Sequence, residues 1–91
     1  MLTLPSELTQ TQASDCLRQL SQALPAETGP CVVVDAAALQ RFDSAALAVL
    51  LDLRRKALAA NKSFAVSSLP NRLADLARLY GIDSLLQASP S

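Results

Sequence analysis

The chain has 91 residues, of which 51% are hydrophobic, and its eight basic side chains balance eight acidic ones to give a net charge of zero. This length supports one small domain, residues 1–91, and the hydrophobic content is typical of a globular chain rather than a disordered one. Zero net charge removes the electrostatic basis for nucleic acid or an anionic membrane as the main partner.

The N-terminus lacks the basic start and apolar run of a signal peptide, because Pro5, Ser6 and Glu7 interrupt it early. No apolar run approaches the roughly 20 residues that a membrane span needs. We therefore expect a cytoplasmic protein without direct membrane insertion. In that compartment Cys16 and Cys31 are predicted to be small core residues rather than a disulfide.

In the first third of the chain, Leu2, Leu4 and Leu8 predict a short opening strand with a kink at Pro5. An amphipathic helix follows and ends near Pro25; its apolar face is formed by Ala13, Cys16, Leu17, Leu20 and Leu24. Residues 31–34 are apolar without alternation, which predicts a central parallel strand over residues 31–35 that is covered on both faces.

A second helix is predicted from about Ser44 to Ala60. Its sheet-facing side chains are Leu47, Leu50, Leu51 and Leu58, and Asp52, Arg55 and Lys56 face solvent. Arg54 falls near the middle of the buried arc, where its stem would pack while its head group reaches water. Ala45, Ala48 and Val49 point away from the sheet, so we interpret them as a small, uncharged docking surface.

Residues 63–67 predict a second core strand, and a third helix follows. The apolar face of this helix is formed by Leu73, Leu76, Ala77 and Tyr80, with Tyr80 as a core aromatic, and Gly81 follows its end. Ile82, Leu85 and Leu86 predict a last helical turn. Strands that alternate with helices predict an α/β fold with a mostly parallel sheet and right-handed crossovers.

The stretch Asp43-Ser44-Ala45-Ala46-Leu47 after a strand ending in Asp35 resembles the signature of the STAS domain, the anti-sigma-factor-antagonist (SpoIIAA-like) fold. Residues 2–8 look like the early strand of that family. Residues 47–51 and the ending 73–82 are similar to MlaB-type STAS proteins, small cytoplasmic subunits of an ABC transporter that moves phospholipid to maintain outer-membrane asymmetry.

Three departures from the family pattern stand out. Ala46 and Ser6 replace glycines, and we expect the first strand of the family to be missing, because the chain begins at Met1. A missing strand would leave a sheet edge unpaired. A partner strand, or a second copy of the chain in a homodimer, would cover that edge.

The resemblance implies partner binding through Asp43, Ser44, Ala45, Ala48, Val49 and Asp52. For Ser44 two roles stay open: an N-cap of the helix, or the serine that is phosphorylated in anti-sigma antagonists. Asp43 either compensates the helix dipole or contacts a partner. Asp52, with Arg55 and Lys56, is either a solvated face or the polar rim of the interface.

Enzymatic interpretations have little support in this sequence. Without histidine, neither a Ser-His nor a Cys-His nucleophile can form, and two glycines are too few for a phosphate-binding loop or a dinucleotide fingerprint. We therefore expect no catalytic residue, no metal and no cofactor, and treat nucleotide binding as the weakest hypothesis.

The resemblance thus implies a non-catalytic STAS subunit that docks the ATPase of a phospholipid ABC transporter, and through it a membrane permease. Its location would be the cytoplasmic side of the inner membrane. The alternative is an anti-sigma factor antagonist that phosphorylation of Ser44 switches off.

Overall fold

The structure of the chain is a computed structural model that describes residues 2–27 and 29–86. Three parallel strands form the main sheet in the order β1-β3-β5, with β1 at Leu2–Thr3, β3 at Cys31–Asp35 and β5 at Ser63–Ser67. A second pair of parallel strands joins β2 (Glu7–Leu8) to β4 (Arg41–Phe42). The predicted α/β class and the central place of residues 31–35 are confirmed.

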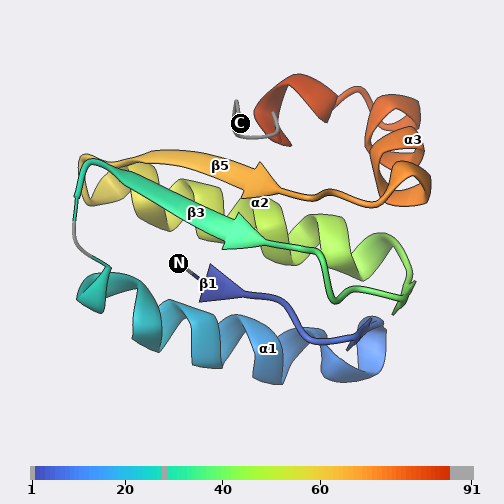
Figure 1. The fold of residues 1–91 in the computed structure, drawn as a ribbon, viewed down its shortest axis with the longest axis horizontal. Helices are drawn as coiled ribbons and strands as arrows, with labels where there is room; N and C mark the ends of the chain where they lie inside the picture. The colour runs from blue at the N-terminus through green and yellow to red at the C-terminus, as the bar shows by residue number, and fades with distance from the viewer. Residues whose placement is uncertain (1, 28, 87–91) are drawn as a thin grey trace.

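The helices alternate with these strands. α1 spans Gln10–Ala23 and continues into a short 3₁₀ helix (Leu24–Ala26); α2 spans Ser44–Ala59, α3 Asn71–Leu79, and a last 3₁₀ helix Asp83–Leu86. α2 and β5 agree with their predicted bounds to within one residue. Figure 1 shows the three strands of the main sheet running in one direction, with α1 and α2 both starting at the edge where the strands end.

The predicted single opening strand is wrong, because the chain at Pro5 and Ser6 passes from one sheet to the other. β1 pairs with the end of β3 (Leu2↔Val34), whereas β2 pairs with β4 (Leu8↔Phe42). The two parallel segments 2–8 and 34–42 therefore run side by side, and the second contains a longer loop between its paired stretches. The backbone N–H groups of Gln40 and Arg41 donate to the Ser6 carbonyl across this gap, at 2.8 and 3.0 Å.

One face of the sheet carries the core. Val32, Val34 and Val66 on that face are fully buried, together with Leu50 and Leu53 of α2. On the opposite face Cys31 and Val33 are only half-buried. The prediction that both faces of β3 are covered is therefore wrong, because the burial along this strand alternates.

α2 and α3 end in the same way, with a left-handed residue after the last turn: Asn61 (φ 62°) and Gly81 (φ 72°). In each case two backbone N–H groups return to the last carbonyls of the helix, the pattern of a Schellman motif. The four bonds run from Asn61 to Leu58, Lys62 to Ala57, Gly81 to Arg78 and Ile82 to Ala77, at 2.9–3.0 Å. The predicted role of Gly81 is confirmed.

Candidate functional site

Two helix N-termini lie side by side at the edge where the strands end. β2 stops at Leu8 and β4 at Phe42, two residues that are paired with each other, and each strand leads into a helix through one N-cap residue. Those N-caps are Thr9 for α1 and Asp43 for α2. The strand pairing therefore fixes the two helix starts as neighbours, although more than 30 residues separate them in sequence.

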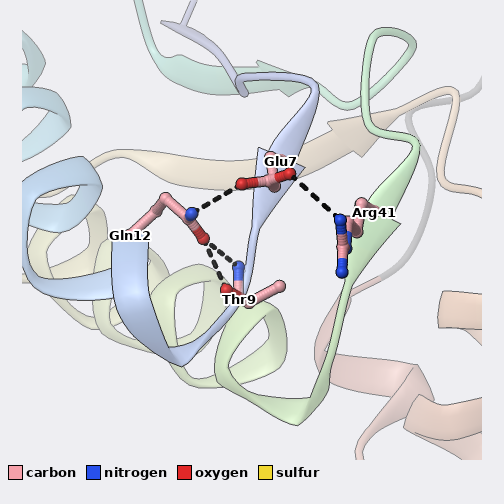
Figure 2. Close-up of polar contacts among 4 residues, drawn as sticks. All are labelled: Glu7, Thr9, Gln12 and Arg41. Carbon is pink, nitrogen blue, oxygen red and sulfur yellow. Dashed lines mark hydrogen bonds and ion pairs between the residues drawn. The ribbon is translucent and has the colours of Figure 1, made fainter.

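A polar network braces this arrangement, as Figure 2 shows. Gln12 of α1 accepts the backbone N–H of Thr9 through its side-chain oxygen at 2.9 Å, the second half of a capping box. The amide nitrogen of the same side chain donates to Glu7 at 2.7 Å. Glu7 in turn lies 3.8 Å from the Arg41 guanidinium. The network thus links β2, the start of α1 and β4.

Asp43 connects the two helices directly. One carboxylate oxygen accepts the N–H of Ala45 in α2 at 2.8 Å, and the other accepts the N–H of Gln10 in α1 at 3.1 Å. The backbone of Asp43 is extended (φ −134°, ψ −166°), as an N-cap requires. Its negative charge therefore faces the positive ends of two helix dipoles, which supports the dipole-compensating interpretation.

Ser44 is not the N-cap, and that predicted role is wrong. It is the first residue of α2, its side chain is exposed, and the capping bond belongs to Asp43 one position earlier. Ser44 borders a surface hollow of ≈ 360 Å³, which is lined by Gln10, Asp43, Ser44, Ala45 and Ala48. Phosphorylation of Ser44 stays a prediction.

The predicted docking residues of α2 divide into two kinds. Ala48 is exposed and Ala45 half-exposed, whereas Val49 is only 2% exposed because it faces α1. The prediction that Val49 points outward is therefore wrong, since α1 packs along this side of α2. Between the helices lies a hollow of ≈ 350 Å³, lined by Ala13, Ser14, Leu17, Ala45, Ala48, Val49 and Asp52.

A third hollow, ≈ 510 Å³, continues along α2 and is lined by Ala48, Leu51, Asp52, Arg54, Arg55 and Leu58. Ala48 borders all three hollows, so its methyl group lies at their junction. We call this surface, from Ser44 to Leu58, the α2 strip. Leu58, predicted to face the sheet, is instead 46% exposed at the end of the strip, while Leu53 and Ala57 occupy the core.

Asp52 is the charged centre of the α2 strip. Its side chain is only 18% exposed, and it pairs with Arg55 and with Lys56, the latter at 3.5 Å. The hydrogen bond from Arg55 is the main cause that holds the pKa of Asp52 below its usual value, and the charge of Lys56 adds to it. Arg55 and Lys56 face solvent as predicted, whereas the carboxylate of Asp52 is sheltered by these two cations.

The structure also contains a surface that sequence reasoning missed. Tyr80, predicted to be a core aromatic, is 55% exposed as the C-cap of α3, and neighbouring Leu79 is 76% exposed. Leu79 borders a hollow of ≈ 370 Å³ with Phe42 and Arg72, whose guanidinium carbon lies 6.0 Å from the centre of the Phe42 ring. The exposure of Leu79 could have been predicted from the sequence, because Leu79 lies outside the helical face that Leu73 and Ala77 define.

Chemical groups for catalysis are sparse in the part of the chain that the structure describes. There, no three His, Cys, Asp or Glu residues gather in a way that could hold a metal ion. Both cysteines are free thiols; Cys16 is buried, and burial raises its pKa. Within residues 2–27 and 29–86, no helix is long and apolar enough to cross a membrane.

In the described part of the chain, the fold is a small α/β domain with a hollowed surface, the α2 strip, along one of its helices. The sequence matches the family described as "Mlab, STAS domain" over residues 1–87. The chain therefore belongs to the MlaB-like STAS domain family, and the predicted family and fold are confirmed. Comparison with the curated proteins finds no match. Family membership supports a role in protein interaction and regulation.

Proposed function

We propose that this chain is the non-catalytic STAS subunit that docks and regulates the ATPase of a phospholipid ABC transporter. The observation that carries the proposal is the α2 strip on a chain of the MlaB-like family. Small side chains at Ala45 and Ala48 allow the backbone of a partner to approach α2 closely. In the proposed assembly the domain lies on the cytoplasmic side of the inner membrane, where the ATPase and its permease hold it.

Regulation by docking requires a difference in affinity between two states of the ATPase. A subunit that binds both states with equal affinity does not shift the equilibrium between them, however tightly it binds. We propose that the α2 strip contacts the assembled arrangement of the ATPase more favourably than the unassembled one. Binding then raises ATPase activity without any catalytic group in this chain.

Affinity purification tests the proposal most directly. The tagged chain is purified from gently solubilised membranes of its native cell, and Ala48→Glu is the matched variant. Wild type should copurify with an ABC ATPase and its permease, while the variant should lose them although its thermal unfolding is unchanged. Equal recovery with both proteins would remove the α2 strip from the proposal, and absence of the transporter from the wild-type sample would overturn the function itself.

The exposed hydroxyl of Ser44 favours a second candidate, an anti-sigma factor antagonist controlled by phosphorylation. At the first position of α2 a phosphate would add nearly two negative charges beside Asp43 and would change the docking surface. Intact mass spectrometry after incubation with cognate lysate and ATP distinguishes the candidates. A phosphate on wild type that is absent from Ser44→Ala supports the switch; an unchanged mass in both contradicts it.

A homodimer is a further part of the proposal, because β1 pairs with only Val34 and Asp35 of β3. The N-terminal half of β3 has no partner strand on that side among the described residues, and a second copy could pair with it. Light scattering during gel filtration gives the mass directly. A monomer across the micromolar range would exclude this arrangement.

A further inference from the structure

Arg54 is distinct among the basic side chains of this chain. All eight lie within the described residues, and the other seven each have an interaction there. Four pair with acidic residues of their own helix, Arg41 pairs with Glu7, Lys62 binds the Glu27 carbonyl, and Arg72 covers Phe42. Within residues 2–27 and 29–86, no hydrogen bond, ion pair or ring contact involves Arg54.

The surroundings of Arg54 make the missing partner significant. The side chain is half-buried and lines the hollow of ≈ 510 Å³ with the apolar residues Leu51 and Leu58. The only carboxylate in this lining, Asp52, is already engaged by Arg55 and Lys56. A cation that is partly withdrawn from water and has no counter-charge gains most from an anion brought by another molecule.

On this basis we propose that the hollow at Arg54 receives a carboxylate side chain of the partner protein, with an adjacent apolar side chain seated between Leu51 and Leu58. The inference rests on the proposed function and specifies the chemistry of the partner: an acidic residue next to an aliphatic or aromatic one. Arg54 supplies the charge recognition, and the two leucines supply the apolar contact area.

Charge and shape favour a protein carboxylate over a membrane phosphate. The chain has zero net charge, and Asp43 lines the hollow beside the start of the strip, so an extended anionic surface would meet an acidic side chain there. A single acidic side chain needs to reach only Arg54, and the carboxylate of Asp52 in the same hollow is already paired with Arg55 and Lys56. The planar guanidinium also suits bidentate binding of one carboxylate.

The test compares four forms of the chain against the purified ATPase subunit of the cognate transporter: wild type, Arg54→Gln, Arg78→Gln and Ala48→Glu. Arg78 is the matched control, because it carries the same charge but is exposed on α3, already pairs with Asp75, and lines none of the three hollows of the α2 strip. Kd is measured by calorimetry at two salt concentrations, and circular dichroism establishes that each variant is folded.

We expect Arg54→Gln to raise Kd by about 10- to 100-fold and Arg78→Gln by less than about threefold, because a partly buried charge pair contributes far more than an exposed one. In a separate charge-swap experiment, an acidic-to-basic substitution on the ATPase that restores binding to a fifth form, Arg54→Glu, would identify the carboxylate. Equal affinities for wild type, Arg54→Gln and Arg78→Gln, with binding still lost in Ala48→Glu, would overturn this inference and leave the proposed function standing.

Two other outcomes also overturn the inference. If wild type does not bind the ATPase, the proposed function fails and this inference fails with it. Sedimentation with vesicles of phosphatidylethanolamine and phosphatidylglycerol tests the lipid alternative separately. Vesicle binding by wild type that Arg54→Gln abolishes would assign the side chain to a lipid phosphate instead.

Discussion

The carboxylate of Asp43 accepts the backbone N–H of Gln10 at 3.1 Å, a contact between the starts of two helices that are 33 residues apart in sequence. The same carboxylate caps α2 through Ala45. Both oxygens of Asp43 are therefore engaged within the domain. This residue sets how α1 and α2 approach each other at the start of the α2 strip, which is the proposed docking surface.

Two substitutions of Asp43 should distinguish the contributions of its two hydrogen bonds, one from Ala45 and one from Gln10. Asp43→Ala removes both acceptors and should lower the free energy of unfolding by about 1–2 kcal/mol. Asp43→Asn keeps an oxygen for Ala45 but offers an N–H group toward Gln10, so it should cost less and should speed hydrogen exchange at the Gln10 amide. Urea unfolding and amide exchange by NMR measure the two effects. An unchanged exchange rate at Gln10 in Asp43→Asn would show that the contact between the helices contributes nothing.

Ala48 and Val49 are neighbours in α2, but substitution by aspartate should affect the stability of the domain very differently at the two positions. Ala48→Asp should change the free energy of unfolding by no more than about 0.5 kcal/mol, since this side chain is exposed. Val49→Asp places a charge at a site that is 2% exposed and should cost more than about 4 kcal/mol, enough to unfold a small domain. Thermal unfolding followed by circular dichroism compares them. A folded Val49→Asp domain would mean that α1 does not cover this side of α2.

The end of α3 depends on the left-handed backbone of Gly81. Gly81→Ala should destabilise the domain by about 1 kcal/mol, because φ is 72° there and a β-carbon is disfavoured at that angle. Among the described residues, no atom other than those of Gly81 and its two chain neighbours lies within 4 Å of the added carbon, so the cost is conformational and not a clash. Gln22→Ala, on the exposed side of α1, is the control and should be near neutral. Urea midpoints that coincide for the two variants would contradict this account.

The ion pairs of Asp52 predict a dependence of stability on pH. Its folded-state pKa lies below the unfolded value, so its stabilisation is complete above the unfolded pKa of about 3.9 and is lost as pH falls through the folded value. Asp52→Asn should therefore be less stable than wild type at pH 7, by up to about 1 kcal/mol for pairs this close to solvent. Urea unfolding at several pH values tests this, and the difference should shrink as the pH falls through the lowered folded-state pKa. A constant difference would point to packing rather than charge.

The spacing of apolar residues and the turn-forming residues between the elements were enough to predict β3, α2 and β5. β3 contains a run of four apolar residues, and α2 has apolar residues at helical spacing over four turns. The cap of α2 was assigned one residue late. Asp43 and Ser44 are both good N-caps, and the choice between them follows from where β4 stops, at Phe42. That pairing joins distant segments and leaves no local signal.

The errors at Val49 and Tyr80 have a common cause. A helical wheel shows which side chains share a face, but it does not show which neighbour covers that face. α1 packs along the side of α2 that the wheel marks as outward and buries Val49, whereas α3 ends at Leu79 and leaves Tyr80 beyond its packed face. The unpaired state of Arg54 is likewise invisible in the sequence, because it depends on which carboxylates the fold places nearby.

The joining of α1 and α2 through Asp43 has a consequence for assembly. The contact closes only when residues 10 and 43 meet, so the α2 strip forms only in the folded domain. A partner that binds the strip would select folded copies and, by mass action, stabilise them; at a concentration 100 times Kd it would add about 2.7 kcal/mol to the stability of the domain. For a chain of 91 residues, that is a large share of the total stability. Copies in excess of their partner would then be the ones most exposed to proteolysis, so the amount of this subunit in the cell would follow the amount of the partner.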